Sequence, residues 1–265
     1  MMQREEHNMA CQITALVSIG KHPESGRARR AEQDARAVEM GMSLSVDQLE
    51  VLHAGNPYDS ALRSYAGMGI SSLRVLSMDE NGDAVKVLSH YLQHKQPDII
   101  LTGVRSEGGE SSGMLPFLLA EALSIPVVVG VAEIVRMTGT EAEVLQALPR
   151  GQRRLLRVSL PFIASVDMAA VAPRQSAYGP ASRAKIDFHD EGVQAVDEAM
   201  LQWEEAPARK KPKRLKVVKA KTAADRFRAA TAKSQSEGGK VLKDKPVAEM
   251  AQSIFDLLLE EGVIR

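Results

Sequence analysis

The chain has 265 residues, of which 44% are hydrophobic and 26% charged, as is usual for one large globular domain with additions. Its 34 basic and 34 acidic side chains give a formal net charge of zero, and only 4% of its residues are aromatic, so a nucleic-acid surface is not expected. The single cysteine, Cys11, excludes disulfides and cysteine-rich zinc sites. Because there is no apolar signal core and no apolar stretch of membrane length, we expect a cytoplasmic protein without membrane insertion.

In the first half of the chain, short apolar runs alternate with amphipathic segments. The apolar runs predict buried strands at residues 13–19, 49–54, 73–77, 98–103 and 126–134. The segments between them predict helices at residues 28–42, 57–69 and 114–123, and one that begins after Asn81. For helix 57–69, Asn56 is the predicted cap and Tyr58 a predicted buried residue. The alternation predicts an α/β fold with a doubly wound, mostly parallel sheet, Rossmann-like and adenine-nucleotide-hydrolase-like.

The loop at residues 103–113 lies between the fourth predicted strand and its helix. It contains four glycines and three serines and offers almost nothing to bury. In an open α/β sheet, loops that leave the carboxyl end of a strand bind ligands, and glycine and serine let backbone N–H groups and hydroxyls meet an anion. The loop is therefore interpreted as a nucleotide or phosphate loop, although no lysine follows its last glycine and it does not read GxGxxG. An ordinary surface loop with a serine helix cap is the alternative.

The pattern changes after residue 134. Two β-like runs around a Pro-Arg-Gly turn predict a hairpin, and further elements follow: a strand at 160–166, an irregular segment at 172–185, helices at 191–205 and 223–233, a basic arm at 207–221 and an amphipathic helix at 246–261. We predict an α/β domain over residues 1–190, and a linker with a C-terminal extended arm and terminal helix over 191–265. The alternatives are a solvated linker for the arm and packing of the helix on its own domain.

No arrangement of residues predicts catalysis of bond chemistry. No Ser-His-Asp or Cys-His set is apparent, and the six histidines lack the spacing of metal ligands. His90 and His94 are expected to share a helix face, but no acidic residue or cysteine accompanies them. Neither a catalytic nor a metal site is therefore expected.

The chain resembles the β subunit of electron transfer flavoproteins over nearly its whole length. The resemblance is carried by residues 16–21, 37–39, 53–57, 66–70 and 98–103, by a Ser-Gly where the family has Thr-Gly, and most specifically by residues 160–174. It implies an electron carrier, not an enzyme, that works as a heterodimer with an electron transfer flavoprotein α subunit. It also implies a flavoprotein dehydrogenase as electron donor and an acceptor oxidoreductase downstream.

The same resemblance implies cofactors and site residues. FAD would be held mainly by the α subunit, and AMP, or a second FAD, would lie in this subunit. Carried over by position, the nucleotide site comprises Ser18, Ala31, Glu32, Gln33, Asp34, Ala54, Gly103, Val104, Arg105, Ser106, Glu110, Ser111, Ser112 and Gly113. The loop is shorter than the family's, and a phosphate in it requires Glu107 and Glu110 to point away from it.

A recognition loop for dehydrogenase partners is implied at residues 172–190, where Tyr178, Gly179 and Pro180 stand in place of an apolar anchor before a proline. Tyr178 is then the anchor, or it packs under its own loop. The linker and terminal helix would dock on the α subunit.

Two other classes compete with the flavoprotein reading. A stand-alone adenine-nucleotide sensor, of the universal-stress-protein type, would share the sheet but does not need the irregular segment or the arm. An enzyme of the nucleotide α-hydrolase type would carry a Ser-Gly-Gly phosphate loop after its first strand, and this sequence has none.

Overall fold

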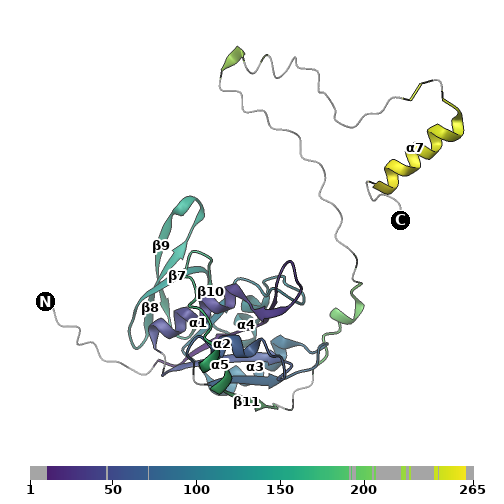
Figure 1. Ribbon diagram of the computed structural model, residues 1–265. Coiled ribbons are helices and arrows are strands. Elements are labelled where there is room, and N and C mark those ends of the chain that lie inside the picture. The colour runs from purple at the N-terminus through teal and green to yellow at the C-terminus, as the bar shows by residue number, and fades with distance from the viewer. Residues whose placement is uncertain are drawn as a thin grey trace. The chain divides into compact units, whose positions relative to one another are not determined.

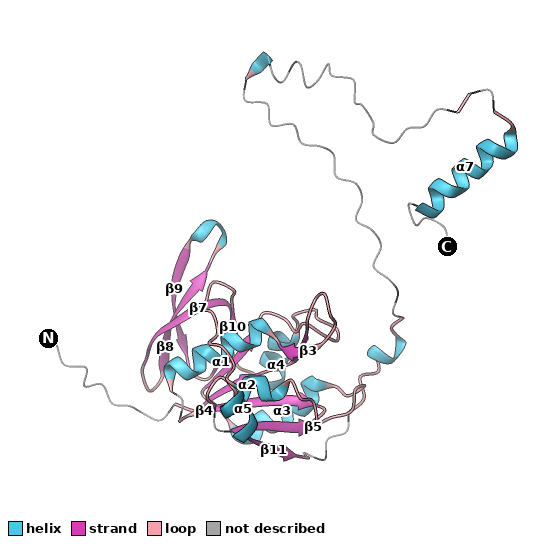
Figure 2. Ribbon diagram, viewed as in Figure 1, coloured by secondary structure: helices cyan, strands magenta, loops and turns pink. Residues whose placement is uncertain are grey.

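The computed structural model in Figures 1 and 2 describes residues 11–45, 47–70, 72–190, 192, 195–204, 206, 222–224, 227, 242–243 and 245–260. Its main sheet consists of β1 (Ile13–Leu16), β4 (Leu49–Gly55), β5 (Ser72–Ser77), β6 (Ile99–Gly103), β7 (Val127–Met137), β8 (Glu141–Ala147), β9 (Arg153–Ser159), β10 (Phe162–Val166) and β11 (Lys185–His189). A small second sheet pairs β2 (Ile19–Lys21) with β3 (Ala28–Arg30). The helices are α1 (Glu32–Leu44), α2 (Leu62–Ala66), α3 (Ala84–Lys95), α4 (Leu115–Leu123), α5 (Tyr178–Arg183) and α7 (Val247–Glu260), with short 3-10 turns η1 (Pro149–Gly151) and η2 (Met200–Gln202).

The order of the strands confirms the predicted doubly wound, mostly parallel α/β sheet. The order is β11-β5-β4-β1-β6-β10-β7-β8-β9, and neighbours from β11 to β7 run parallel. From β1 the chain builds outward through β4 and β5 and then returns to place β6 on the other side of β1. The carboxyl ends of β1 and β6 therefore form the topological switch point, where ligands bind in open sheets of this kind.

Two clusters of apolar side chains fill the two faces of the sheet. Helices α1 and α2 pack on one face, where Val38, Leu62 and Tyr65 are fully buried. Helices α3 and α4 pack on the other face, around Leu92 and Leu119. Since both faces are covered, the strands between them are apolar throughout, as β6 and β10 show by burying all their residues.

The hairpin predicted after residue 134 forms as β8 and β9, joined at η1 and antiparallel to each other and to β7. The next strand, β10, returns to the middle of the sheet and pairs with β6 and β7. Its position between two strands that precede it in the chain completes the buried part of the sheet beside the switch point.

The predictions around the first two helices are wrong in detail. Residues 28–30, which were predicted to belong to the first helix, form β3 and pair with β2, so α1 begins only at Glu32. The first buried strand also ends earlier than predicted, because Ile19 belongs to β2. Tyr58 is 84% exposed, because the Asn56 side chain accepts a hydrogen bond from the Tyr58 N–H in a tight turn and α2 begins only at Leu62. Asn56, which was predicted to cap the helix, thus belongs to a turn that precedes the helix.

The irregular segment after residue 171 is more ordered than the sequence indicated. It contains α5, and then β11, which joins the edge of the sheet beside β5. Of the helix expected at 191–205, the described residues form η2 and a single bridge between Gly82 and Val196, so that prediction is wrong there. The bridge holds this segment beside the loop that precedes α3.

The chain divides into two compact units, Met1–Trp203 and Glu204–Arg265. In the second unit, α7 confirms the predicted amphipathic helix, with Met250, Ile254 and Leu257 at helical spacing. The basic arm at 207–221 and most of residues 223–233 lie outside the described residues, so what was predicted for them stays a prediction. No helix in the described part of the chain combines the length and apolar character that a membrane crossing requires.

Candidate functional site

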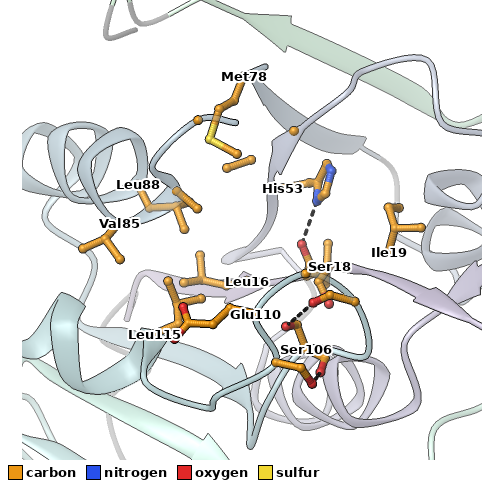
Figure 3. A pocket seen from close by; sticks show the side chains of 18 of the residues that line it. Leu16, Ser18, Ile19, His53, Met78, Val85, Leu88, Ser106, Glu110 and Leu115 are labelled. Atoms are coloured by element: carbon orange, nitrogen blue, oxygen red, sulfur yellow. Dashed lines mark hydrogen bonds between the residues drawn. The ribbon is translucent and has the colours of Figure 1, made fainter. Parts of the chain in front are cut away.

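A cavity of about 800 Å³ lies at the switch point and is called here the switch-point cavity. It is lined by the ends of β1, β4 and β6, the loop from Arg105 to Gly113, the starts of α3 and α4, and Asp197 and Met200 from the segment after β11. Its volume falls within the usual range for small-molecule and cofactor sites. Figure 3 shows Leu16, Val85, Leu88 and Met78 on one side of this cavity and Ser18 and Ser106 on the other.

Most of the residues predicted for a nucleotide site line this cavity. They are Ser18, Asp34, Ala54, Gly103, Arg105, Ser106, Glu110, Ser111, Ser112 and Gly113. Ala31, Glu32, Gln33 and Val104 are not among its lining residues. The structure therefore brings the phosphate-loop candidates and the ends of the first two long strands together, and it leaves most of the entry to α1 outside.

The loop that leads into α4 presents backbone N–H groups. Gly109, Ser111 and Gly113 have positive φ angles of 67°, 54° and 78°, whereas the residues between them do not. Alternating backbone handedness turns successive N–H groups toward one side and forms a concave site for an anion. Residues 109–110 form a hydrogen-bonded turn, and in the described part of the chain no side-chain acceptor takes a hydrogen bond from the N–H groups of residues 106–113, so the donors outside that turn are available to a ligand.

The first turn of α1 holds this loop in place. The Glu107 carboxylate accepts hydrogen bonds from the Glu32 N–H (2.9 Å) and from the Arg29 guanidinium (3.0 Å). The Gln33 side chain accepts one from the Arg105 N–H (3.2 Å). Since Ala31 offers no side-chain cap, a carboxylate from the distant loop occupies the positive end of the helix. Glu107 thus points away from the cavity, as a bound phosphate requires, whereas Glu110 lines it.

Asp34 is the buried carboxylate beneath the loop. Its Oδ2 accepts hydrogen bonds from the N–H (2.8 Å) and the hydroxyl (2.6 Å) of Ser18, and the Gly103 N–H also donates to this carboxylate. Burial raises the pKa of Asp34 to about 6, against the opposing effect of these donors. Asp34 therefore ties the carboxyl ends of β1 and β6 to α1 at the point where the cavity opens.

Gly103 is required for this close approach. A Cβ at this position would lie 2.3 Å from Asp34 Oδ1 and 3.1 Å from the Asp34 backbone nitrogen. The Tyr65 hydroxyl adds a second tie, because it accepts from the Ala31 N–H (2.8 Å) and donates to the Ser18 carbonyl oxygen (2.7 Å). The switch point is thus a hydrogen-bonded junction of two strands and two helices.

The apolar side of the cavity was not predicted from the sequence, where most of its residues were assigned only to strands and helices. They are Leu16, Leu52, Met78, Val85, Leu88, Leu115 and Leu118. An apolar wall opposite a set of backbone donors suits a ligand with a flat or apolar part and an anionic part. The position of these residues at strand ends and helix starts was the signal available, since that edge faces the ligand in open sheets.

Acidic side chains also line the cavity and were not predicted. They are Asp79, Glu80, Asp83 and Asp197, near the start of α3. Asp83 caps α3 by accepting from the Val85 N–H (3.0 Å), and Asp197 accepts from the Met200 N–H (3.0 Å). This end of the cavity is unfavourable for a phosphate. An anionic group therefore fits better at the N–H groups of residues 108–113 than beside α3, and its binding there requires the Glu110 carboxylate to turn away from it.

The segment implied to recognise partners has a fixed base and an exposed tip. The Arg174 guanidinium forms two hydrogen bonds of 2.8 Å with the Glu39 carboxylate, and this pairing lowers the pKa of Glu39. The Arg63 guanidinium donates to the Ala181 carbonyl oxygen (3.1 Å) near the end of α5. Tyr178, at the start of α5, is 88% exposed, so its side chain does not pack under its own loop.

Within the described residues, no group of three or more histidine, cysteine or acidic side chains is arranged to hold a metal ion. His94 Nδ1 contacts the carbonyl oxygen of His90 on the preceding turn of α3 (2.8 Å). Nδ1 of His94 is therefore engaged within α3.

Comparisons with known proteins agree on one family. The model of the electron transfer flavoprotein domain matches residues 24–191. The chain is also 48% identical over 259 residues to the electron transfer flavoprotein subunit beta of Chromohalobacter salexigens, and the match covers 97% of each chain. These similarities favour the flavoprotein reading over that of a stand-alone nucleotide sensor.

Proposed function

Because the chain belongs to the electron transfer flavoprotein β-subunit family, we propose that it pairs with an α subunit and passes electrons from a flavoprotein dehydrogenase to an acceptor oxidoreductase. The members of this family are electron carriers, and their bound FAD supplies the redox chemistry. In this proposal the α subunit holds most of the FAD. The residues of this chain bind a nucleotide, position it and present a docking surface.

The observation that carries the nucleotide proposal is the switch-point cavity. The N–H groups of residues 108–113 would meet the phosphate of AMP, and the apolar wall around Leu16 and Leu88 would accept a base. Glu107 is withdrawn to the start of α1, so its charge is held by Arg29 and the helix. A second FAD in the same cavity is the variant of this proposal.

The identity of the nucleotide is tested on the purified heterodimer. The chain is co-expressed with an α subunit, and the bound nucleotides are released with acid and identified by chromatography. One FAD and one AMP per heterodimer support the proposal, and two FAD support its variant. FAD alone would mean that the cavity binds no nucleotide, and the absence of both a complex and a flavin would overturn the function as a whole.

Two glycines offer a matched test of the phosphate loop. Gly109 (φ 67°) in the loop and Gly151 (φ 77°) in the hairpin both adopt the left-handed conformation, and a Cβ at either position would meet open space. Alanine strains the backbone at both positions by a similar amount, of about 1 kcal/mol. We expect Gly109→Ala to lower the bound AMP and Gly151→Ala to leave it unchanged, as measured by acid release. Equal occupancy in the two variants would contradict a role for the loop.

We also propose that Tyr178 anchors a dehydrogenase partner. Its side chain is exposed, whereas the base of its segment is fixed by Arg174 and Arg63, and a rigidly presented aromatic side chain is an effective anchor. We expect Tyr178→Ala to slow electron transfer from the dehydrogenase at least tenfold, with bound FAD unchanged. A rate equal to that of the unmodified heterodimer would remove this role.

The C-terminal unit is proposed to dock on the α subunit through the apolar side of α7. Removing residues 240–265 should abolish or greatly weaken the heterodimer, as measured by co-purification, because the apolar side of an amphipathic helix must be buried. An undiminished complex would contradict docking by this helix.

A further inference from the structure

His53 lines the switch-point cavity at the carboxyl end of β4 and was not among the residues predicted for the site. Its side chain is 6% exposed, so it is buried in the edge of the sheet (Figure 3). A buried polar group normally has hydrogen-bond partners for each of its polar atoms. The two ring nitrogens of His53 therefore need to be considered one at a time.

Nδ1 of His53 lies 2.8 Å from the carbonyl oxygen of Val17, at the end of β1. A carbonyl oxygen only accepts hydrogen bonds, so Nδ1 carries the hydrogen. Burial lowers the pKa of His53, which keeps the ring neutral at pH 7. A neutral ring with its hydrogen on Nδ1 has a lone pair on Nε2, which is then an acceptor.

Nε2 has no hydrogen-bond partner in the described part of the chain. Space beside it is kept by Gly55, two residues along the same strand, because a Cβ there would come within 2.7 Å of Nε2. Near its end, β4 therefore carries a histidine whose Nε2 atom is left uncovered because Gly55 has no side chain. This arrangement gives the cavity an acceptor at the carboxyl end of β4, away from the N–H donors of the loop at residues 108–113.

We propose that His53 Nε2 accepts a hydrogen bond from an N–H or O–H group of the nucleotide in the switch-point cavity, and so selects the nucleotide by its donors. The inference rests on the proposed function, since it requires a nucleotide in this cavity. Two parts of AMP carry such donors, namely the exocyclic amino group of the base and the sugar hydroxyls. A base with a carbonyl oxygen in place of the amino group would place two acceptors against each other and bind more weakly.

Two substitutions separate the two nitrogens. In His53→Asn the amide N–H₂ can still donate to the Val17 carbonyl, but nothing remains at the position of Nε2. In His53→Gln the amide oxygen reaches toward the position of Nε2 and can accept in its place. The first variant removes the proposed contact while it keeps the structural one, and the second restores an acceptor.

The experiment measures the affinity of the full-length chain, in complex with its α subunit and freed of nucleotide by dialysis, for four compounds. These are AMP, IMP, 2′-deoxy-AMP and 3′-deoxy-AMP, titrated by calorimetry. We expect His53→Asn to weaken AMP binding about 10-fold and His53→Gln to weaken it less. The analogue that lacks the donor should bind about 10-fold more weakly than AMP to the unmodified complex but equally to His53→Asn. IMP in this role identifies the amino group, and a deoxynucleotide identifies a hydroxyl.

Several results would overturn the inference. One is AMP binding by His53→Asn at the unmodified affinity, and another is an equal loss for all four compounds, which indicates a structural role. If His53→Asn does not fold, the inference is overturned instead when the unmodified complex binds AMP and all three analogues with equal affinity. If the unmodified complex binds no AMP, the nucleotide proposal fails together with this inference, whereas AMP binding without discrimination removes only the role of His53.

Discussion

The first turn and the middle of helix α1 bury two carboxylates by different means. Glu39, in the middle, pairs with the Arg174 guanidinium, which lowers its pKa and fixes the base of the segment that carries Tyr178. Asp34, in the first turn, pairs with no basic side chain in the described part of the chain and relies on the N–H and hydroxyl of Ser18 and the N–H of Gly103. Burial raises its pKa to about 6 against the effect of these donors. A salt bridge stabilises the fold at one place, and at the other an unpaired charge holds two strand ends at the edge of a cavity. The site is therefore built where the protein gives up stability.

The largest effect is expected at the junction beneath the cavity. Gly103→Ala places a Cβ 2.3 Å from Asp34 Oδ1 and close to the backbone of α1, so either the carboxylate or the strand must shift. We expect a loss of about 3 kcal/mol in the free energy of unfolding, measured by urea titration at pH 7. Bound AMP should fall with it, because the loop starts at this residue.

Gly108→Ala is the control for that substitution. It lies in the same loop, but a Cβ there would make only an ordinary contact of 3.5 Å with the Ile19 carbonyl oxygen. We expect its stability to stay within about 0.5 kcal/mol of the unmodified chain. A similar loss in both variants would mean that the loop tolerates no side chain, and that the contact with Asp34 has no special role.

The second effect is a dependence of stability on pH. Because the pKa of Asp34 is about 6 in the folded chain and near 3.8 in the unfolded one, folding takes up a proton between these values. The stability that this group contributes is present below pH 4 and is lost as the pH rises through about 6. The total change is about 3 kcal/mol. In Asp34→Asn, urea titrations from pH 4 to 7 should lack this decline, and an unchanged profile would contradict the raised pKa.

Much of this architecture could be predicted from the sequence, because strands and helices of a doubly wound sheet leave different apolar periods. The pairing of β10 between β6 and β7 could not, since the chain gives no local signal for which strands will be neighbours. The same holds for the site. Glu107 meets the Glu32 N–H across 75 positions of sequence, and the apolar wall of the cavity has the same composition as the core. His53 has no partner nearby in the sequence that would have marked it.

Substitution of Glu39 should change stability with the opposite dependence on pH from Asp34, and the loss of stability at pH 7 should be smaller than that expected for Gly103→Ala. Glu39→Gln removes the ion pair with Arg174, whose side chain is 47% exposed, so solvent screens part of the interaction. We expect a loss of about 2 kcal/mol at pH 7. Since the pairing lowers the pKa of Glu39, its contribution is present above the unfolded pKa and disappears as the pH falls through the folded one. A difference in stability between the unmodified chain and Glu39→Gln that does not shrink as the pH falls would contradict the contrast with Asp34.

The smallest effect is expected for Glu107, which joins the cavity loop to the start of α1. Its partner in the ion pair, Arg29, has a side chain that is 40% exposed, and a glutamine at position 107 can still accept a hydrogen bond from the Glu32 N–H. Glu107→Gln should therefore cost only about 0.5 kcal/mol, and 1 M salt should reduce the difference further. The substitution also removes a negative charge that raises the pKa of Asp34, so the decline of stability with pH should move to a lower pH. A loss of several kcal/mol that is insensitive to salt would show instead that the charge of Glu107, like that of Asp34, is held where solvent does not reach it.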